Sequence, residues 1–154
     1  MKPSSGFLMR ESWRPDVVLA HKREFAGGRD APGHVRAVVI GLLGDRLGTE
    51  LLFDMGVLVS EVVTNAVRHG GANRHCIIVV HLALAPEVLR IEVCDQGPGF
   101  VAPRTPRRRA QGGGSGLVLL EHMSSRWGVA VDDGTCVWFE RNLTPRDYVE
   151  KPAC

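Results

Sequence analysis

The chain has 154 residues, which is enough for one domain with one sizeable hydrophobic core. Apolar residues make up 44 % and charged residues 23 % of the chain, as in an ordinary soluble globular protein. The net charge of +2 is too small to indicate nucleic-acid binding. No run approaches the roughly 18 apolar residues of a membrane span, and the N-terminus lacks the continuous apolar core of a signal peptide. We therefore expect a cytoplasmic protein with no membrane partner and no direct nucleic-acid partner.

The cysteines show no recognisable pattern. The sequence has no CxxC pair and no Cys/His cluster with zinc spacing among Cys76, Cys94, Cys136 and Cys154. This favours free thiols in a reducing compartment over a metal site or a disulfide.

The N-terminal part of the chain predicts an arm, an edge strand and a helix. Residues 1–15 are polar and contain Pro3 and Pro15, which indicates a flexible arm. Residues 16–28 can supply an edge strand that ends at two glycines. Residues 31–48 have helical spacing and stop at Gly48; their apolar positions are Val35, Val38, Val39, Leu42, Leu43 and Leu47.

A longer helix is predicted over residues 50–69, with Thr49 as its N-cap and Gly70 and Gly71 at its end. Its apolar residues fall on one arc at 100° per residue: Leu51, Met55, Leu58, Val59, Val62, Val63 and Ala66. On the same wheel Asp54, Glu61 and Asn65 lie along one border of the arc. A border position suits a side chain that faces a cleft.

The rest of the chain alternates between strands and one helix. Residues 75–84 and 87–95 predict two strands, with Leu89, Ile91 and Val93 on one face of the second. A basic loop and a glycine-rich segment precede a predicted helix over residues 117–127, which includes Trp127. Strands over 129–133 and 135–140 follow. Short turns between consecutive strands indicate antiparallel pairs. The fold class is α+β: a two-layer α/β sandwich with a mixed, mostly antiparallel sheet and helices on one face.

Two glycine-bearing segments flank the basic loop that precedes the predicted helix over residues 117–127. DQGPGF, residues 95–100, ends a strand with a carboxylate and two glycines; it suits close approach to a flat ligand but is equally a common turn. GGGSGL, residues 112–117, precedes a helix. Backbone N–H groups at a helix start favour phosphate, although a flexible linker has the same composition.

Glu61 and Asn65 add the chemistry that these segments lack. Side chains at positions i and i+4 point the same way from adjacent helical turns. An Asn carbonyl oxygen can ligate a Mg²⁺ that also binds phosphates, and a Glu one turn earlier can orient or deprotonate a hydroxyl group. In isolation, the pair also fits the solvated edge of an amphipathic helix.

Taken together, these segments resemble the nucleotide-binding domain of the superfamily that includes gyrase, bacterial histidine kinases and Hsp90-type chaperones (GHKL, or Bergerat fold). SEVVTNAVRHG, residues 60–70, looks like its N box, DQGPGF like its first glycine box and GGGSGLVLL like its second. The resemblance covers about residues 30–140. Within that group, LVSEVVTNAVRHG and GTCVWFE look like the anti-sigma-factor serine/threonine kinases of Gram-positive bacteria, especially actinobacterial ones.

The resemblance implies a role for each matching position. Glu61 would be the catalytic base and Asn65 the Mg²⁺ ligand. Asp95 would bind the adenine amino group, supported by Thr135. The other positions implied to bind ATP are His69, Gly97, Gly99, Gly112, Gly114, Gly116 and the amide of Leu117. A structural cap is an equally good interpretation of His69.

One residue departs from the family pattern, and one group of arginines is an additional feature of this chain. These kinases often carry an Arg before the last glycine of the second box, where this chain has Ser115. The loop between the boxes contains Arg107, Arg108 and Arg109, which can screen phosphate charge, contact an acidic partner or simply be solvated.

The resemblance implies an ATP- and Mg²⁺-dependent kinase that phosphorylates an anti-sigma-factor antagonist and sequesters a sigma factor. The alternative is a nucleotide-dependent binding module with little or no kinase activity. The catalytic half of a histidine kinase is disfavoured, because about 45 residues before the N-box helix leave no room for a helical pair with a phospho-accepting His. The expected organisation is an arm over 1–15, an ATP-binding kinase domain over 16–141 and a tail over 142–154. The family leads us to expect a homodimer.

Overall fold

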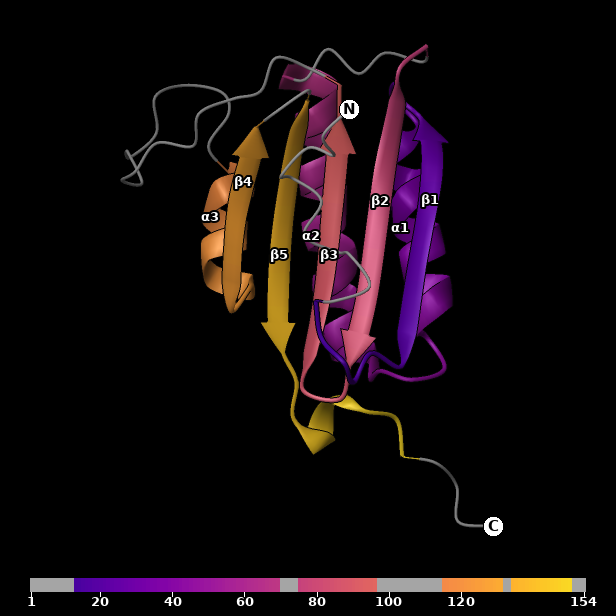
Figure 1. Ribbon diagram of the computed structural model, residues 1–154, viewed down its shortest axis with the longest axis vertical. Coiled ribbons are helices and arrows are strands. Elements are labelled where there is room, and N and C mark those ends of the chain that lie inside the picture. Colours follow the sequence, from indigo (N-terminus) through magenta and orange to yellow (C-terminus); the bar gives the residue numbers. More distant parts are fainter. Residues whose placement is uncertain (1–12, 70–74, 97–114, 132–133, 151–154) are drawn as a thin grey trace.

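The computed structural model describes residues 13–69, 75–96, 115–131 and 134–150. The elements run in the order β1 (Leu19–Ala26), α1 (Ala31–Leu43), α2 (Thr49–His69), β2 (Ile77–Ala85), β3 (Val88–Asp95), α3 (Ser115–Met123), β4 (Arg126–Val131), β5 (Thr135–Asn142) and a short 3₁₀ helix (Pro145–Asp147). The strands form one sheet in the order β1-β2-β3-β5-β4, and each neighbouring pair is antiparallel. All three helices lie on one face of this sheet (Figure 1).

The hydrophobic core fills the space between the sheet and the helices. All seven apolar residues on the predicted arc of α2 are buried, as are Leu89, Ile91 and Val93 on β3. Phe139 on β5 and Leu120 on α3 complete the same cluster. The predicted fold class is therefore confirmed, as is the position of β1 at the edge of the sheet.

Two predicted helices end earlier than expected. α1 stops at Leu43, because the chain turns at Gly44 and Leu47 pairs instead with Tyr148 in an isolated bridge. α3 stops at Met123, and Trp127 lies on β4, so its predicted place on a helix is wrong. The break occurs at Ser124 and Ser125. The Ser124 hydroxyl donates to the Leu120 carbonyl, and the Ser125 amide donates to the Glu140 carbonyl at 2.7 Å, which starts the strand. α2 begins at Thr49 itself, one residue before the predicted start.

The segment after β5 packs back on the domain. Leu143 is buried, and the Tyr148 hydroxyl donates to the Pro86 carbonyl at 2.8 Å. The Gly48 amide donates to the Asp147 carbonyl at 2.8 Å, which ties this segment to the start of α2. Residues 142–150 thus brace the end of the sheet where β2 turns into β3.

The prediction of four free thiols is wrong for two of them. Cys94 on β3 lies directly opposite Cys136 on β5, and the two form a disulfide with a Cα–Cα distance of 4.0 Å. Spacing along the chain hides this pair because 42 residues separate its members. Cys76 is not part of the disulfide, and Cys154 lies outside the described residues.

Candidate nucleotide-binding site

The topology brings the predicted site residues to one end of the sheet. β3 ends at Asp95, and β5 begins at Thr135, which is its register partner. The C-terminal end of α2 lies at this same end, because α2 leads into β2 and β2 runs antiparallel to β3. α3 also begins here, since its other end leads into β4, whose last residue pairs with Thr135. Figure 1 shows these four chain segments together at the top of the molecule.

Glu61 and Asn65 lie on adjacent turns of α2, and both side chains are half-buried. They flank the buried face that carries Val62 and Ala66. The hydroxyl groups on the outer side of the helix are satisfied locally: Ser60 donates to the Gly56 carbonyl and Thr64 to the Ser60 carbonyl, both at 2.7 Å. Within the described ranges, Glu61 and Asn65 form no side-chain hydrogen bond or ion pair.

Thr135 places an unsatisfied buried hydroxyl at this end of the sheet. Its side chain is 2 % exposed, and its Oγ1 has no hydrogen-bond partner among the described residues. An unsatisfied buried hydroxyl costs about 1–3 kcal/mol. Strand alternation places it with Asp95 on the helix-facing side of the sheet. A polar ligand beside Asp95 can satisfy it, which fits the amino-bearing edge of a nucleotide base.

Gly134 allows β5 to approach the end of β3. A Cβ atom at this position would lie 2.0 Å from the carbonyl oxygen of Asp95 and 3.2 Å from the Cα of Gln96. Both atoms belong to the backbone and cannot rotate away. Only glycine therefore allows Asp95 and Thr135 to pair at the observed distance between the strands. The position of Gly134 between two predicted strands did not reveal this role.

α3 presents its N-terminus to the same end of the sheet. It begins at Ser115, so the backbone of Gly116 and Leu117 forms its first turn, where N–H groups and the helix dipole favour an anion. Its C-terminal end is held by Arg141, whose Nη1 donates to the Met123 carbonyl at 2.6 Å. Sequence reasoning missed Arg141. A basic side chain near a helix C-terminus is a known stabilising feature, but here it comes from a different strand.

Several predicted site residues lie outside the described residues: Gly97, Gly99, Gly112, Gly114 and the arginines at 107–109. The side chain of His69 is also outside them. Their assigned roles stay predictions. In the described part of the chain, no group of three His, Cys, Asp or Glu side chains could hold a metal ion. The role of Asn65 as a Mg²⁺ ligand, together with the phosphates of a nucleotide, stays a prediction.

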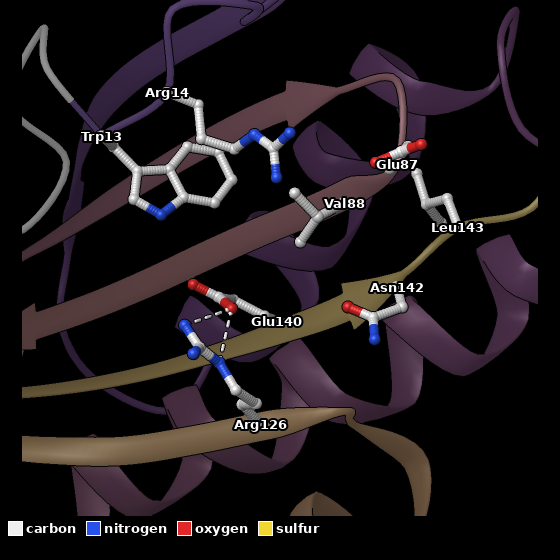
Figure 2. Close-up of a pocket in the computed structure, with 8 residues that line it drawn as sticks. All are labelled: Trp13, Arg14, Glu87, Val88, Arg126, Glu140, Asn142 and Leu143. Carbon is white, nitrogen blue, oxygen red and sulfur yellow. Dashed lines mark hydrogen bonds and ion pairs between the residues drawn. The ribbon is translucent and has the colours of Figure 1, made fainter.

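A separate cavity of about 660 Å³ lies on the other face of the sheet. Figure 2 shows Trp13 and Arg14, Glu87 and Val88 at the β2–β3 turn, and the ion pair between Arg126 and Glu140 around it. This cavity lies at the opposite end of β3 and β5 from Asp95 and Thr135. It is therefore distinct from the candidate nucleotide site.

The antiparallel sheet with helices on one face is the architecture of a GHKL-type ATP-binding domain. The chain belongs to the histidine kinase-like ATPase domain family, whose model matches residues 32–141. This match covers more than half of the chain and includes every predicted site residue. It supports an ATP-binding domain of the GHKL type. No curated protein matches the chain closely enough to narrow the family further.

Proposed function

We propose that this protein is an ATP-dependent serine/threonine kinase that phosphorylates an anti-sigma-factor antagonist and also sequesters a sigma factor. One observation carries the proposal. The Glu61 carboxylate and the Asn65 amide lie one turn apart on α2, without partners among the described residues, beside the end of the sheet that carries Asp95 and Thr135. A domain that only held nucleotide would not need a carboxylate at that position.

The proposed chemistry assigns one task to each group. Bound ATP with Mg²⁺ supplies the phosphoryl group and neutralises charge on the phosphates. Asp95 accepts a hydrogen bond from the base amino group, while Thr135 offers its hydroxyl beside it. Asn65 offers its carbonyl oxygen to the cation. Glu61 orients the acceptor hydroxyl and takes its proton as the oxygen attacks.

The second candidate is a nucleotide-dependent binding module with little or no kinase activity. Ser115 favours it, because the kinases that this chain resembles often have an Arg there, and a serine offers no positive charge to the phosphates. In both candidates we propose a sigma factor and its antagonist as protein partners, a homodimeric protein and a cytoplasmic location. In the described part of the chain, no helix is long and apolar enough to cross a membrane.

Phosphotransfer from labelled ATP to candidate antagonist proteins separates the two candidates. We expect Glu61→Ala to lower the rate at least about 100-fold, the usual size of a lost general base, while ATP still binds. Glu50→Ala is the matched control, because Glu50 is an exposed carboxylate on the first turn of the same helix. Equal rates for wild type and Glu61→Ala would exclude Glu61 as the base. No transfer by wild type, with ATP bound, would favour the binding module.

Calorimetry with ATP and Mg²⁺ tests the site itself. We expect wild type to bind and Asp95→Ala to lose binding, because the substitution removes the acceptor for the base amino group. An absence of binding heat for both proteins would overturn the assignment of a nucleotide site.

A further inference from the structure

The disulfide between Cys94 and Cys136 lies immediately behind the proposed base-binding residues. Each cysteine is one residue away from a member of the pair Asp95 and Thr135 along its own strand. Strand alternation turns the sulfur atoms to the outer face of the sheet, while Asp95 and Thr135 face the helices. The disulfide therefore does not enter the nucleotide site. Instead, it joins the two strands whose backbones position Asp95 and Thr135.

This connection lies where the strand pairing would otherwise be weakest. Asp95 and Thr135 form the last register pair of β3 and β5, and strand ends open most readily. The two strand ends also approach each other closely, since a Cβ atom on residue 134 would lie 2.0 Å from the Asp95 carbonyl oxygen. A covalent bond one pair inside the end restricts such shifts.

The disulfide also closes a loop that contains the phosphate side of the site. The 42-residue separation between its cysteines includes the second glycine segment, α3 and β4. One bond thus joins the two ends of the segment that carries α3 and β4.

The cysteines of the disulfide are not fully buried, which favours approach of a reductant from the outer face. Both cysteines are partly exposed. Their cross-strand neighbours on this face are the small residues Val79 and Ala130. Access to the sulfur is one requirement for thiol–disulfide exchange.

We propose that the Cys94–Cys136 disulfide is a redox modification site that controls the affinity of the adjacent site for nucleotide. The oxidised form holds Asp95 and Thr135 in the binding arrangement. In the reduced form the strand ends separate more readily, and nucleotide binds more weakly. This proposal rests on the proposed nucleotide-binding function. In a reducing compartment such a disulfide would be of the transient, redox-sensing kind.

The chemistry needs a dithiol as its second reactant. One thiolate of the dithiol attacks a cysteine sulfur, forms a mixed disulfide and releases the other cysteine as a thiolate. The second thiol of the reductant then displaces the first cysteine. The protein gains two electrons and two protons as two thiols, and the dithiol leaves as its own disulfide.

The test compares oxidised protein with protein reduced by dithiothreitol, and mass spectrometry counts the thiols in each. Calorimetry with ATP and Mg²⁺ should show Kd rising about tenfold on reduction. The double variant Cys94→Ser/Cys136→Ser should bind like the reduced protein in both conditions. Cys76→Ser is the control, because it removes a cysteine outside the disulfide and should keep the response.

Hydrogen exchange without nucleotide provides a readout that does not depend on ATP binding. We expect the amides of residues 94–96 and 134–136 to exchange faster after reduction, because the pairing at this end opens more often. If reduction speeds exchange but neither the oxidised nor the reduced protein binds ATP, the proposed nucleotide-binding function is overturned. The control of the strand ends by the disulfide is supported in that case. Unchanged exchange and unchanged Kd, with two thiols gained, would overturn the redox proposal. So would failure of the disulfide to form in the wild type under oxidant.

Discussion

The two faces of β3 and β5 use buried polar groups in opposite ways. On the outer face, Arg90 donates two hydrogen bonds to Glu92 Oε1, at 2.9 and 2.6 Å, and one to Glu140 Oε1 at 2.7 Å. On the helix-facing side, the Thr135 hydroxyl has no partner among the described residues. The first arrangement is largely completed by the protein's own charges, and Glu92 Oε2 is the atom in it that has no hydrogen-bond partner within the described part of the chain. The second is left incomplete at the place where a ligand would complete it.

The outer-face network also continues beyond these two strands. Arg126 on β4 donates to Glu140 Oε2 at 3.0 Å, so both oxygens of that carboxylate are engaged. The guanidinium of Arg90 lies 4.2 Å from the centroid of the Trp138 ring. Burial raises the pKa of Glu92, and the hydrogen bonds from Arg90 act against that rise. Charges that are 0–4 % exposed are tolerated here because each has an opposite partner.

Substitution of Arg90 is expected to have the largest effect. Arg90→Ala would leave two buried carboxylates without their shared cation, which costs about 3–5 kcal/mol in the free energy of unfolding. Denaturant unfolding measures this loss. Arg126→Ala is the matched control, because its side chain is 68 % exposed and it holds only one of the two carboxylates. Equal effects of the two substitutions would contradict the view that burial makes this network structural.

Acid should destabilise the outer face through His81. This residue is 4 % exposed on β2, and burial, followed by the charge of Lys22, lowers its pKa to about 4. The unfolded chain, with a His pKa near 6.5, then binds more protons than the folded chain between about pH 6.5 and pH 4. Above about pH 6.5, His81 therefore does not lower the free energy of unfolding. As the pH falls from about 6.5 to about 4, protonation of His81 in the unfolded chain lowers the free energy of unfolding by up to about 3 kcal/mol.

Unfolding measured across this pH range, in wild type and His81→Phe, tests the assignment. The variant should lose most of the dependence on pH. Glu92 is the neighbour of His81 on β3, and its raised pKa gives a dependence of opposite sign, so the difference between the two proteins is the informative quantity. A dependence that stays the same without the imidazole would show that other groups cause it.

Gly134→Ala should lower both the free energy of unfolding and the affinity for ATP. The new methyl group would meet the Asp95 carbonyl oxygen at 2.0 Å, so the strands must move apart at the site. Overpacking of this kind costs about 1–3 kcal/mol, and we expect ATP affinity to fall as well. Gly33→Ala is the control, because a Cβ atom there meets nothing within 4 Å. Retention of both stability and affinity in Gly134→Ala would show that this approach of the strands is not needed.

The placement of residues on the helix-facing side was easier to predict than that on the outer face, for physical reasons. Helical geometry fixes the angle between residues, so the border position of Glu61 and Asn65 followed from their numbers alone. Alternation places Arg90 and Glu92 on the face of β3 opposite Leu89, Ile91 and Val93. It gave no sign that these charges are buried, because burial depends on partners such as Glu140, which lies 50 residues away along the chain.

The failed predictions share that dependence on distant residues. The disulfide requires the register of β3 against β5, which local spacing does not encode. Trp127 had helical spacing, but the hydrogen bond from Ser125 to Glu140 ends the helix and begins a strand. Arg141 holds the end of α3 from β5. In each case, a contact between segments far apart in sequence overrides the local pattern.

Thr135→Val should have the smallest effect on stability and the most specific effect on binding. Valine has nearly the shape of threonine, and the lost hydroxyl has no partner within the described residues. Removing an unsatisfied buried hydroxyl should leave the free energy of unfolding unchanged or raise it slightly, whereas loss of a hydrogen bond to the nucleotide should weaken ATP binding about tenfold. Calorimetry and denaturant unfolding on the same preparation separate the two effects. A loss of stability without a change in Kd would mean that the hydroxyl serves the fold, and Thr135 would then belong with Arg90 among the groups that the protein completes by itself.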